Sequence, residues 1–159
     1  MEENIIQLKK DNILRVDIVD SDGNKTGEQL QFDIEDIELP FRLQECEKQH
    51  NQNIEDIKAK LLIIDKKQNH KGKGLLSKKD EEKLKAIKEF YKKESDALDL
   101  FLGENGTKKM LNGRKPYIGM FNDISEALEP VLEKLKLKEE NILDTIRKKY
   151  SKKDEDIIE

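Results

Sequence analysis

The chain has 159 residues, of which 42% are charged and 35% hydrophobic, and its formal net charge is −4. This balance is more polar than that of an average globular protein, which favours amphipathic helices around a modest core. Acidic and basic residues are interspersed, and only four of the basic residues are arginines. A nucleic-acid-binding protein would need a basic face of one sign, preferably rich in arginine, so nucleic acid is not an expected partner.

The sequence also argues against a membrane or secreted protein. No apolar run approaches the ~18 residues that a membrane-spanning helix needs, and no stretch resembles a signal peptide. The single cysteine, Cys46, cannot form a disulfide within the chain. We therefore expect a protein of the reducing cytoplasm of its host cell, without a membrane among its partners.

The first predicted element is a β-hairpin over about 12–35. The stretches ILRVDIVD and LQFDI alternate apolar and polar residues with a period of two, which is typical of half-buried strands. Between them, DSDGNKTG contains the residues of a tight turn. Because an isolated hairpin is only marginally stable in water, one of its faces must pack on helices or one of its edges must pair with another subunit.

The turn of this hairpin also resembles the beginning of a calcium-binding loop, with Asp20, Asp22 and Asn24 at alternating positions. The resemblance then fails, because Lys25 stands where the loop needs glycine and Gln31 where it needs glutamate. The flanking segments are strands, whereas a calcium loop of this type joins two helices. The interpretation as a turn is therefore favoured over a calcium site.

Two long helices are predicted next. Apolar residues recur at spacings of three and four over about 38–67, with Asp36 as the expected N-terminal cap. Ser77, followed three residues later by Asp80, predicts the beginning of the second helix. That helix is expected to end at Gly103, which serves as a left-handed stop.

A third helix is predicted to begin near Tyr117, opened by Pro116, and Pro130 is expected to kink or divide it near Glu129. The run EENILDTIRKKY continues the helical pattern to the end of the core sequence.

The predicted architecture is a single α+β domain over 1–150, mostly helical. The N-terminal β-hairpin is followed by a bundle of three or four helices over about 37–150. Residues 151–159 are highly charged and are expected to form a flexible tail.

Few residues suggest catalysis or metal binding. Cys46 and His50 have a spacing that can hold a metal on one helix, but no second pair of ligands completes a site. Since both lie on the apolar stripe, a buried thiol and an imidazole at the edge of the core are favoured. Glu94 also falls on an apolar stripe, and we place it at the margin of that stripe rather than in a catalytic role. His70 has no identifiable partner, and the lysine-rich segment 66–79 is interpreted as a solvated loop. We expect no catalytic residue, no metal and no cofactor.

The stretch FLGENGTKKMLNGRKPYIGMF contains four of the eight glycines and suggests a phosphate-binding loop. Such a loop requires G-x-x-x-x-G-K-[ST] directly after a strand. Here the order is Gly106-Thr107-Lys108, and a helix precedes it, so the nucleotide reading is rejected. We predict instead a short helical turn, TKKML, that buries Met110 and Leu111, and a second turn at Asn112-Gly113.

The same stretch carries a family resemblance. The sequence DLFLGENGTKKMLNGRKPYIGMFNDISEAL resembles the small tail-assembly chaperones of long-tailed phages and prophages, especially those of Gram-positive hosts. In that family a helix ends in aromatic and aliphatic residues followed by Gly. The motif Gly-Thr/Ser-Lys-Lys comes next, and another helix follows it. The N-terminal hairpin ending in Phe32-Asp33 is also similar to the family pattern. The resemblance covers about 12–135 in layout, and its specific part is 99–128.

The resemblance implies a non-enzymatic function. Such chaperones bind the tape-measure protein, keep it soluble until tail-tube subunits polymerise around it, and are absent from the mature tail. The tail-tube protein is a second candidate partner, and the hairpin edge can support self-association into a homo-oligomer. The residues expected to contact a partner are Met120, Phe121, Ile124 and Leu128; the alternative for all four is the intramolecular core.

Two other classes of function remain as alternatives. One is a phage-encoded adaptor or inhibitor that binds a host protein, or a minor structural protein. The other is a small enzyme or metal protein built on the cysteine–histidine pair.

Overall fold

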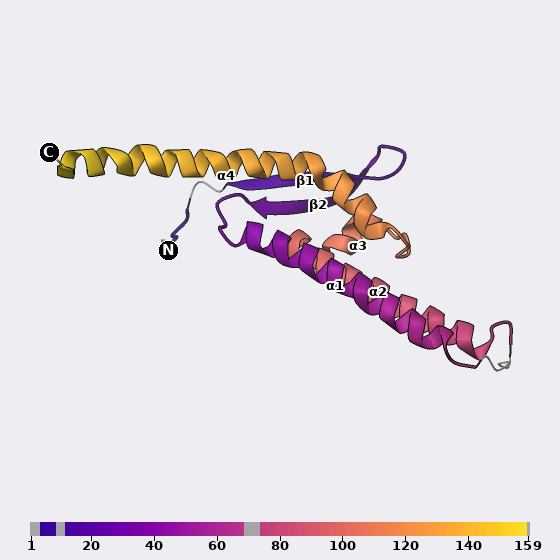
Figure 1. The fold of residues 1–159 in the computed structure, drawn as a ribbon. Coiled ribbons are helices and arrows are strands. Elements are labelled where there is room, and N and C mark those ends of the chain that lie inside the picture. The colour runs from indigo at the N-terminus through magenta and orange to yellow at the C-terminus, as the bar shows by residue number, and fades with distance from the viewer. Residues whose placement is uncertain (1–3, 9–11, 69–73, 159) are drawn as a thin grey trace.

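The computed structural model describes residues 4–8, 12–68 and 74–158, with side chains described as far as residue 149. Two strands are followed by four helices: β1 (Ile13–Val19), β2 (Lys25–Asp33), α1 (Leu39–Asp65), α2 (Lys78–Leu102), α3 (Gly106–Leu111) and α4 (Met120–Ile158). Figure 1 shows α1 and α2 running together away from the β-hairpin, while α4 runs along the hairpin and beyond it. The predicted fold class, a hairpin followed by a largely helical part, is confirmed.

The hairpin is antiparallel and presents one apolar face. Leu14 lies opposite Phe32 and Val16 opposite Leu30, so side chains of the same character share a face of the sheet. Leu30 and Phe32 are buried in the core cluster, and the alternating polar residues are exposed. The period of two in the sequence is therefore explained by helices packing on one face of this two-stranded sheet.

The turn between β1 and β2 is held by its own first residue. The Oδ1 atom of Asp20 accepts hydrogen bonds from the backbone N–H groups of Asp22 and Asn24, each at 2.9 Å. This is the side-chain-to-backbone pattern by which Asp stabilises turns. One of the two Asp20 carboxylate oxygens is thus already engaged by the backbone of the turn.

The ends of α1 and α2 lie close to the predicted ones. The Ser77 hydroxyl accepts a hydrogen bond from the backbone N–H of Asp80 at 3.1 Å, which confirms the predicted cap of α2. Gly103 ends α2 with φ 92° and ψ 178°. This positive φ suits glycine, although the ψ lies outside the left-handed helical region that we expected. Asp36 does not cap α1; its carboxylate accepts the N–H of Glu38, one turn before the helix.

α4 begins later and extends further than predicted. It starts at Met120, because Tyr117–Gly119 forms a turn in which the Met120 N–H bonds to the Tyr117 carbonyl at 3.2 Å. Pro130 lies inside a continuous helix, so it does not divide the element. Figure 1 shows α4 changing direction in its orange N-terminal part, as an internal proline is expected to cause. Residues 151–158, predicted to form a tail, continue α4.

The glycine-rich stretch is a structural joint between α2 and α3. Thr107 is buried, its N–H donates to Asp99 Oδ1 at 2.8 Å, and its hydroxyl lies 2.7 Å from the same oxygen. Gly106 is buried as well, whereas Met110 and Leu111, which we expected to be buried, are only half-buried. The Gly-Thr pair therefore fixes α3 onto the last turns of α2, and no phosphate-binding role is needed to explain it.

Replacing Gly106 by alanine should destabilise the protein. A Cβ atom at this position would lie 2.3 Å from the Cβ of Leu102, closer than two carbon atoms can approach. We expect the free energy of unfolding to fall by roughly 1–3 kcal/mol, the usual cost of overpacking. Urea denaturation followed by circular dichroism measures this. The matched control is Asn105→Gly, since Asn105 has φ 60° and glycine adopts that conformation without strain. Equal stability of Gly106→Ala and the wild type would contradict the packing of α3 described above.

Candidate partner-binding groove

The four residues predicted for partner contact do not form a free surface. Met120, Ile124 and Leu128 belong to the buried core, and Met120 is only 1% exposed. Phe121 is half-buried and its ring stacks on that of His50, with centroids 3.7 Å apart. A partner could reach Met120, Ile124 and Leu128 in full only if α4 moved away from the rest of the protein, whereas Phe121 also lines a second groove. In this structure the alternative interpretation, the intramolecular core, applies to Met120, Ile124 and Leu128.

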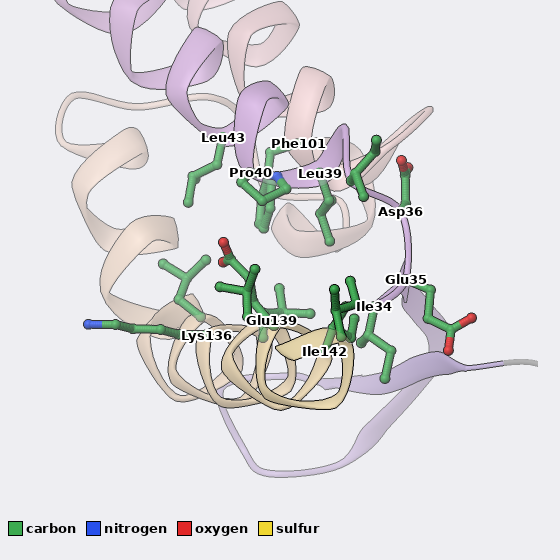
Figure 2. A pocket seen from close by; sticks show the side chains of 15 residues that line it. Ile34, Glu35, Asp36, Leu39, Pro40, Leu43, Phe101, Lys136, Glu139 and Ile142 are labelled. Atoms are coloured by element: carbon green, nitrogen blue, oxygen red, sulfur yellow. The ribbon is translucent and has the colours of Figure 1, made fainter. Parts of the chain in front are cut away.

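An apolar surface that a partner could reach lies further along α4. A groove of about 520 Å³ separates the later part of α4 from the beginning of α1 and the loop before it. Figure 2 shows Leu39, Pro40 and Leu43 on one side of the groove, with Ile142 on the α4 side. The remaining apolar residues that line it are Ile34, Ile37, Phe101, Leu132, Leu135, Leu143 and Ile146.

The part of α4 that borders this groove, residues 132–146, is called the arm below. Among the described side chains, the last buried one in α4 is Val131. In the arm, Leu132, Leu135 and Ile142 are half-buried, and Leu143 and Ile146 are exposed. Their spacing of three, four and seven places them on one face of the helix, which is the pattern of a face that packs on something. Within the described chain this face is only partly covered.

The opposite wall is shaped by the loop between β2 and α1. Asp33 Oδ1 accepts the N–H of Glu35 at 3.0 Å, and Asp36 Oδ1 accepts the N–H of Glu38 at 2.9 Å. The Asp36 carboxylate also pairs with Arg42, and this hydrogen bond lowers the pKa of Asp36. These bonds hold the acidic side chains against their own backbone, and Ile34 and Ile37 complete the apolar lining.

A second groove, of about 300 Å³, lies between α1, α2 and the start of α4. At this groove Glu94 is 3% exposed and has partners for both carboxylate oxygens. His50 Nδ1 lies 2.6 Å from Glu94 Oε2, and Asn53 Nδ2 donates to Glu94 Oε1 at 2.9 Å. The placement of Glu94 at the margin of its stripe is therefore wrong. The three side chains form a polar clamp between α1 and α2, and the stacked Phe121 connects this clamp to α4.

The neighbouring thiol has no reactive character. Cys46 is buried, and desolvation, followed by the charges of Glu47 and Glu94, raises its pKa to about 12. A thiol rather than a thiolate is therefore present at neutral pH, and only the thiolate is a good nucleophile or metal ligand. The described residues contain no group of three histidine, cysteine, aspartate or glutamate side chains that could hold a metal ion.

The lysine-rich segment is partly described. Lys67 pairs with Glu82 at 3.3 Å, and Lys79 Nζ donates to the carbonyl of Asp65 at 2.7 Å. These lysines join the ends of α1 and α2, in agreement with a solvated connection between helices. His70 lies outside the described residues.

Comparisons with family models, with curated proteins and with solved structures found no match for this chain. In the described ranges, no helix combines the length and the apolar character that crossing a bilayer requires.

Proposed function

We propose that this protein is a tail-assembly chaperone of a long-tailed phage or prophage, and that it binds the tape-measure protein through the groove beside the arm. The observation that carries the proposal is the open apolar groove, which adjoins an incompletely covered helical face. The sequence resemblance supplies the identity of the client. The resembling stretch also contributes to the groove, because Phe101 belongs both to that stretch and to the groove lining.

The shape of the groove suits a helical client. An amphipathic helix can place its apolar stripe in a hydrophobic groove through residues at i, i+3, i+4 and i+7. The arm spans 15 residues, which corresponds to about 22 Å of helix. A client helix of similar length would cover Leu143 and Ile146 and would pack against Ile37 on the opposite wall. Several such contacts, each modest, would hold an unassembled protein in solution and still release it when tube subunits compete for it.

The charge of the protein supports the same role. Its net charge of −4 and its 42% of charged residues keep the surface outside the groove well solvated. In a complex with an apolar helix, the client's apolar stripe would be covered by the groove, and the charged surface of this protein would face the solvent. No chemical step is needed for this activity, in line with the expectation that the protein is not an enzyme.

Co-expression with the tape-measure protein of the same phage or prophage tests the proposal. We expect the wild-type protein to increase the soluble fraction of the tape-measure protein and to co-elute with it in size-exclusion chromatography. The double variant Ile142→Glu/Leu143→Glu should weaken the complex at least about tenfold, because it places two charges in an apolar interface.

The matched control is Leu137→Glu, an exposed residue on the opposite side of the same helix. This variant should bind like the wild type. If wild-type protein leaves the tape-measure protein aggregated and gives no co-eluting complex, the proposed function is wrong. Equal binding by the wild type and both variants would preserve the function but exclude this groove.

A further inference from the structure

The segment Asn4–Leu8 is apolar and lies uncovered in solvent. Ile5 is 73% exposed, Ile6 101% and Leu8 93%. Three large aliphatic side chains within four consecutive positions are costly to leave in water, and such a cluster usually marks a contact surface. Neither the core nor the pairing of the strands accounts for them, because β1 begins only at Ile13.

This segment enters the fold at the rim of the groove described above. The carbonyl of Asn12 accepts the N–H of Ile34 at 3.0 Å, and the Asn12 side-chain amide donates to the carboxylate of Glu35. Ile34 and Glu35 both line the groove. Figure 1 shows the N-terminal segment at the same end of the molecule as the later part of α4 and the loop before α1.

The chain between the N-terminal segment and the groove is long enough for the segment to reach the groove. Leu8 is four residues from Asn12, and four residues span at most about 14 Å. An exposed aliphatic segment is thus tethered at the edge of an apolar groove that no described part of the chain fills. In the sequence, Lys9 and Lys10 follow directly, and the groove lining contributes three carboxylates, of Glu35, Asp36 and Glu139, and one amine, of Lys136. The order of apolar and basic residues in the segment therefore complements the apolar groove and its predominantly acidic border.

We propose that residues 4–8 dock in cis into the groove beside the arm when no client is bound, and that a client helix displaces them. The segment acts as an internal substitute for the client, covering the aliphatic lining around Leu143 and Ile146. Burying three aliphatic side chains lowers the free energy of the docked state, whereas ordering the backbone that carries them raises it. These two free-energy contributions are of similar size. The contact is consequently weak enough to be displaced, and the open arrangement of this structure is its other state.

This inference rests on the groove of the proposed function, but its test needs no client. Ile6→Cys is combined with Leu143→Cys in a Cys46→Ala background, and the control pair is Ile6→Cys with Leu137→Cys. Leu137 is also exposed, but it lies on the side of α4 that faces away from the groove. The two pairs share one tether, so under mild oxidation of dilute full-length protein docking should make the first pair form an intramolecular disulfide about tenfold faster than the control pair.

Two results of the cross-linking would overturn the inference. Equal rates for the two pairs would show that the segment does not visit the groove. A cross-linked dimer in place of a cross-linked monomer would show that the groove takes the segment of a second copy. In either case, binding of the tape-measure protein would be unaffected, so failure here is distinguishable from failure of the proposed function.

A second measurement keeps the native cysteine and does not depend on a successful Cys46→Ala variant. The triple variant Ile5→Ser/Ile6→Ser/Leu8→Ser should bind an apolar fluorescent dye more strongly than the wild type, because the groove is freed. The control variant, Leu75→Ser, removes a fully exposed leucine from the connection between α1 and α2 and should not increase dye binding. If the segment does not dock, removing three exposed aliphatic side chains should leave dye fluorescence unchanged or reduce it, which would contradict the proposal.

Discussion

Phe32→Ala is expected to lower the free energy of unfolding by about 3–5 kcal/mol, the range observed when a buried phenylalanine is truncated. Phe32 is 1% exposed, and its ring stacks on that of Phe101 with centroids 5.1 Å apart. The side chain therefore joins the hairpin to the end of α2. Its loss leaves a cavity in the core cluster, and within the described residues the two-stranded sheet has no second sheet to support it.

Chemical denaturation in urea, followed by circular dichroism, measures this loss. The control is Gln31→Ala, since Gln31 is the exposed neighbour on the same strand and should change stability by less than about 0.5 kcal/mol. Similar stabilities for the two variants would mean that the hairpin does not pack on the helices as described.

Glu94→Ala is expected to destabilise the protein by about 3 kcal/mol. The carboxylate is almost completely buried and joins His50 and Asn53 of α1 to α2. Removing it leaves the buried Asn53 and the partly buried His50 without their partner, and the Asn53 amide cannot regain water in the folded state. Glu94→Gln should cost less, because the amide can still accept a hydrogen bond from Asn53.

The control for this variant is Glu89→Ala on the same helix. Glu89 also pairs with a residue of α1, Lys60 at 3.0 Å, but both side chains are about half exposed. We expect little change in its urea midpoint, since exposed ion pairs contribute little. If Glu94→Ala were as stable as Glu89→Ala, the buried clamp would have no structural role.

Local sequence signals predicted most of the secondary structure. The alternation around Val16 and Phe32 gave the hairpin, and the Ser77–Asp80 spacing gave the beginning of α2. The beginning of α4 was misplaced because Pro116 is a good helix opener, whereas the turn ending at Gly119, with φ 80°, delays the helix to Met120. Local helix propensity alone could not decide whether the helix begins near Tyr117 or at Met120.

The burial of Glu94 depended on contacts across the sequence. Its partners His50 and Asn53 are 44 and 41 residues away, on a different helix. A carboxylate on an apolar stripe is stable only if such partners face it, and the pairing of α1 with α2 decides that. The available signal was the matching polar positions on the stripe of α1, which together indicate a buried polar contact.

A related reason explains why periodicity did not separate core positions from exposed positions in α4. The apolar stripe of α4 continues from Met120 to Ile146, so periodicity marks the whole length as a packing face. The hairpin and α2 cover only its first part, and the arm extends beyond them (Figure 1). The stripe is core where the hairpin and α2 cover it and exposed surface where it extends past them. The sequence does not state where that cover ends.

Hydrogen–deuterium exchange of the protein with and without the tape-measure protein tests the central claim most directly. The arm makes few packing contacts, so its amides should exchange readily in the free protein. We predict that the client slows exchange over residues 34–43 and 132–146 and leaves the distal parts of α1 and α2 unchanged. Protection confined to the second groove, around Ile54–Leu61 and Ile87–Tyr91, or no protection in a proven complex, would contradict the assignment of the groove beside the arm as the client site.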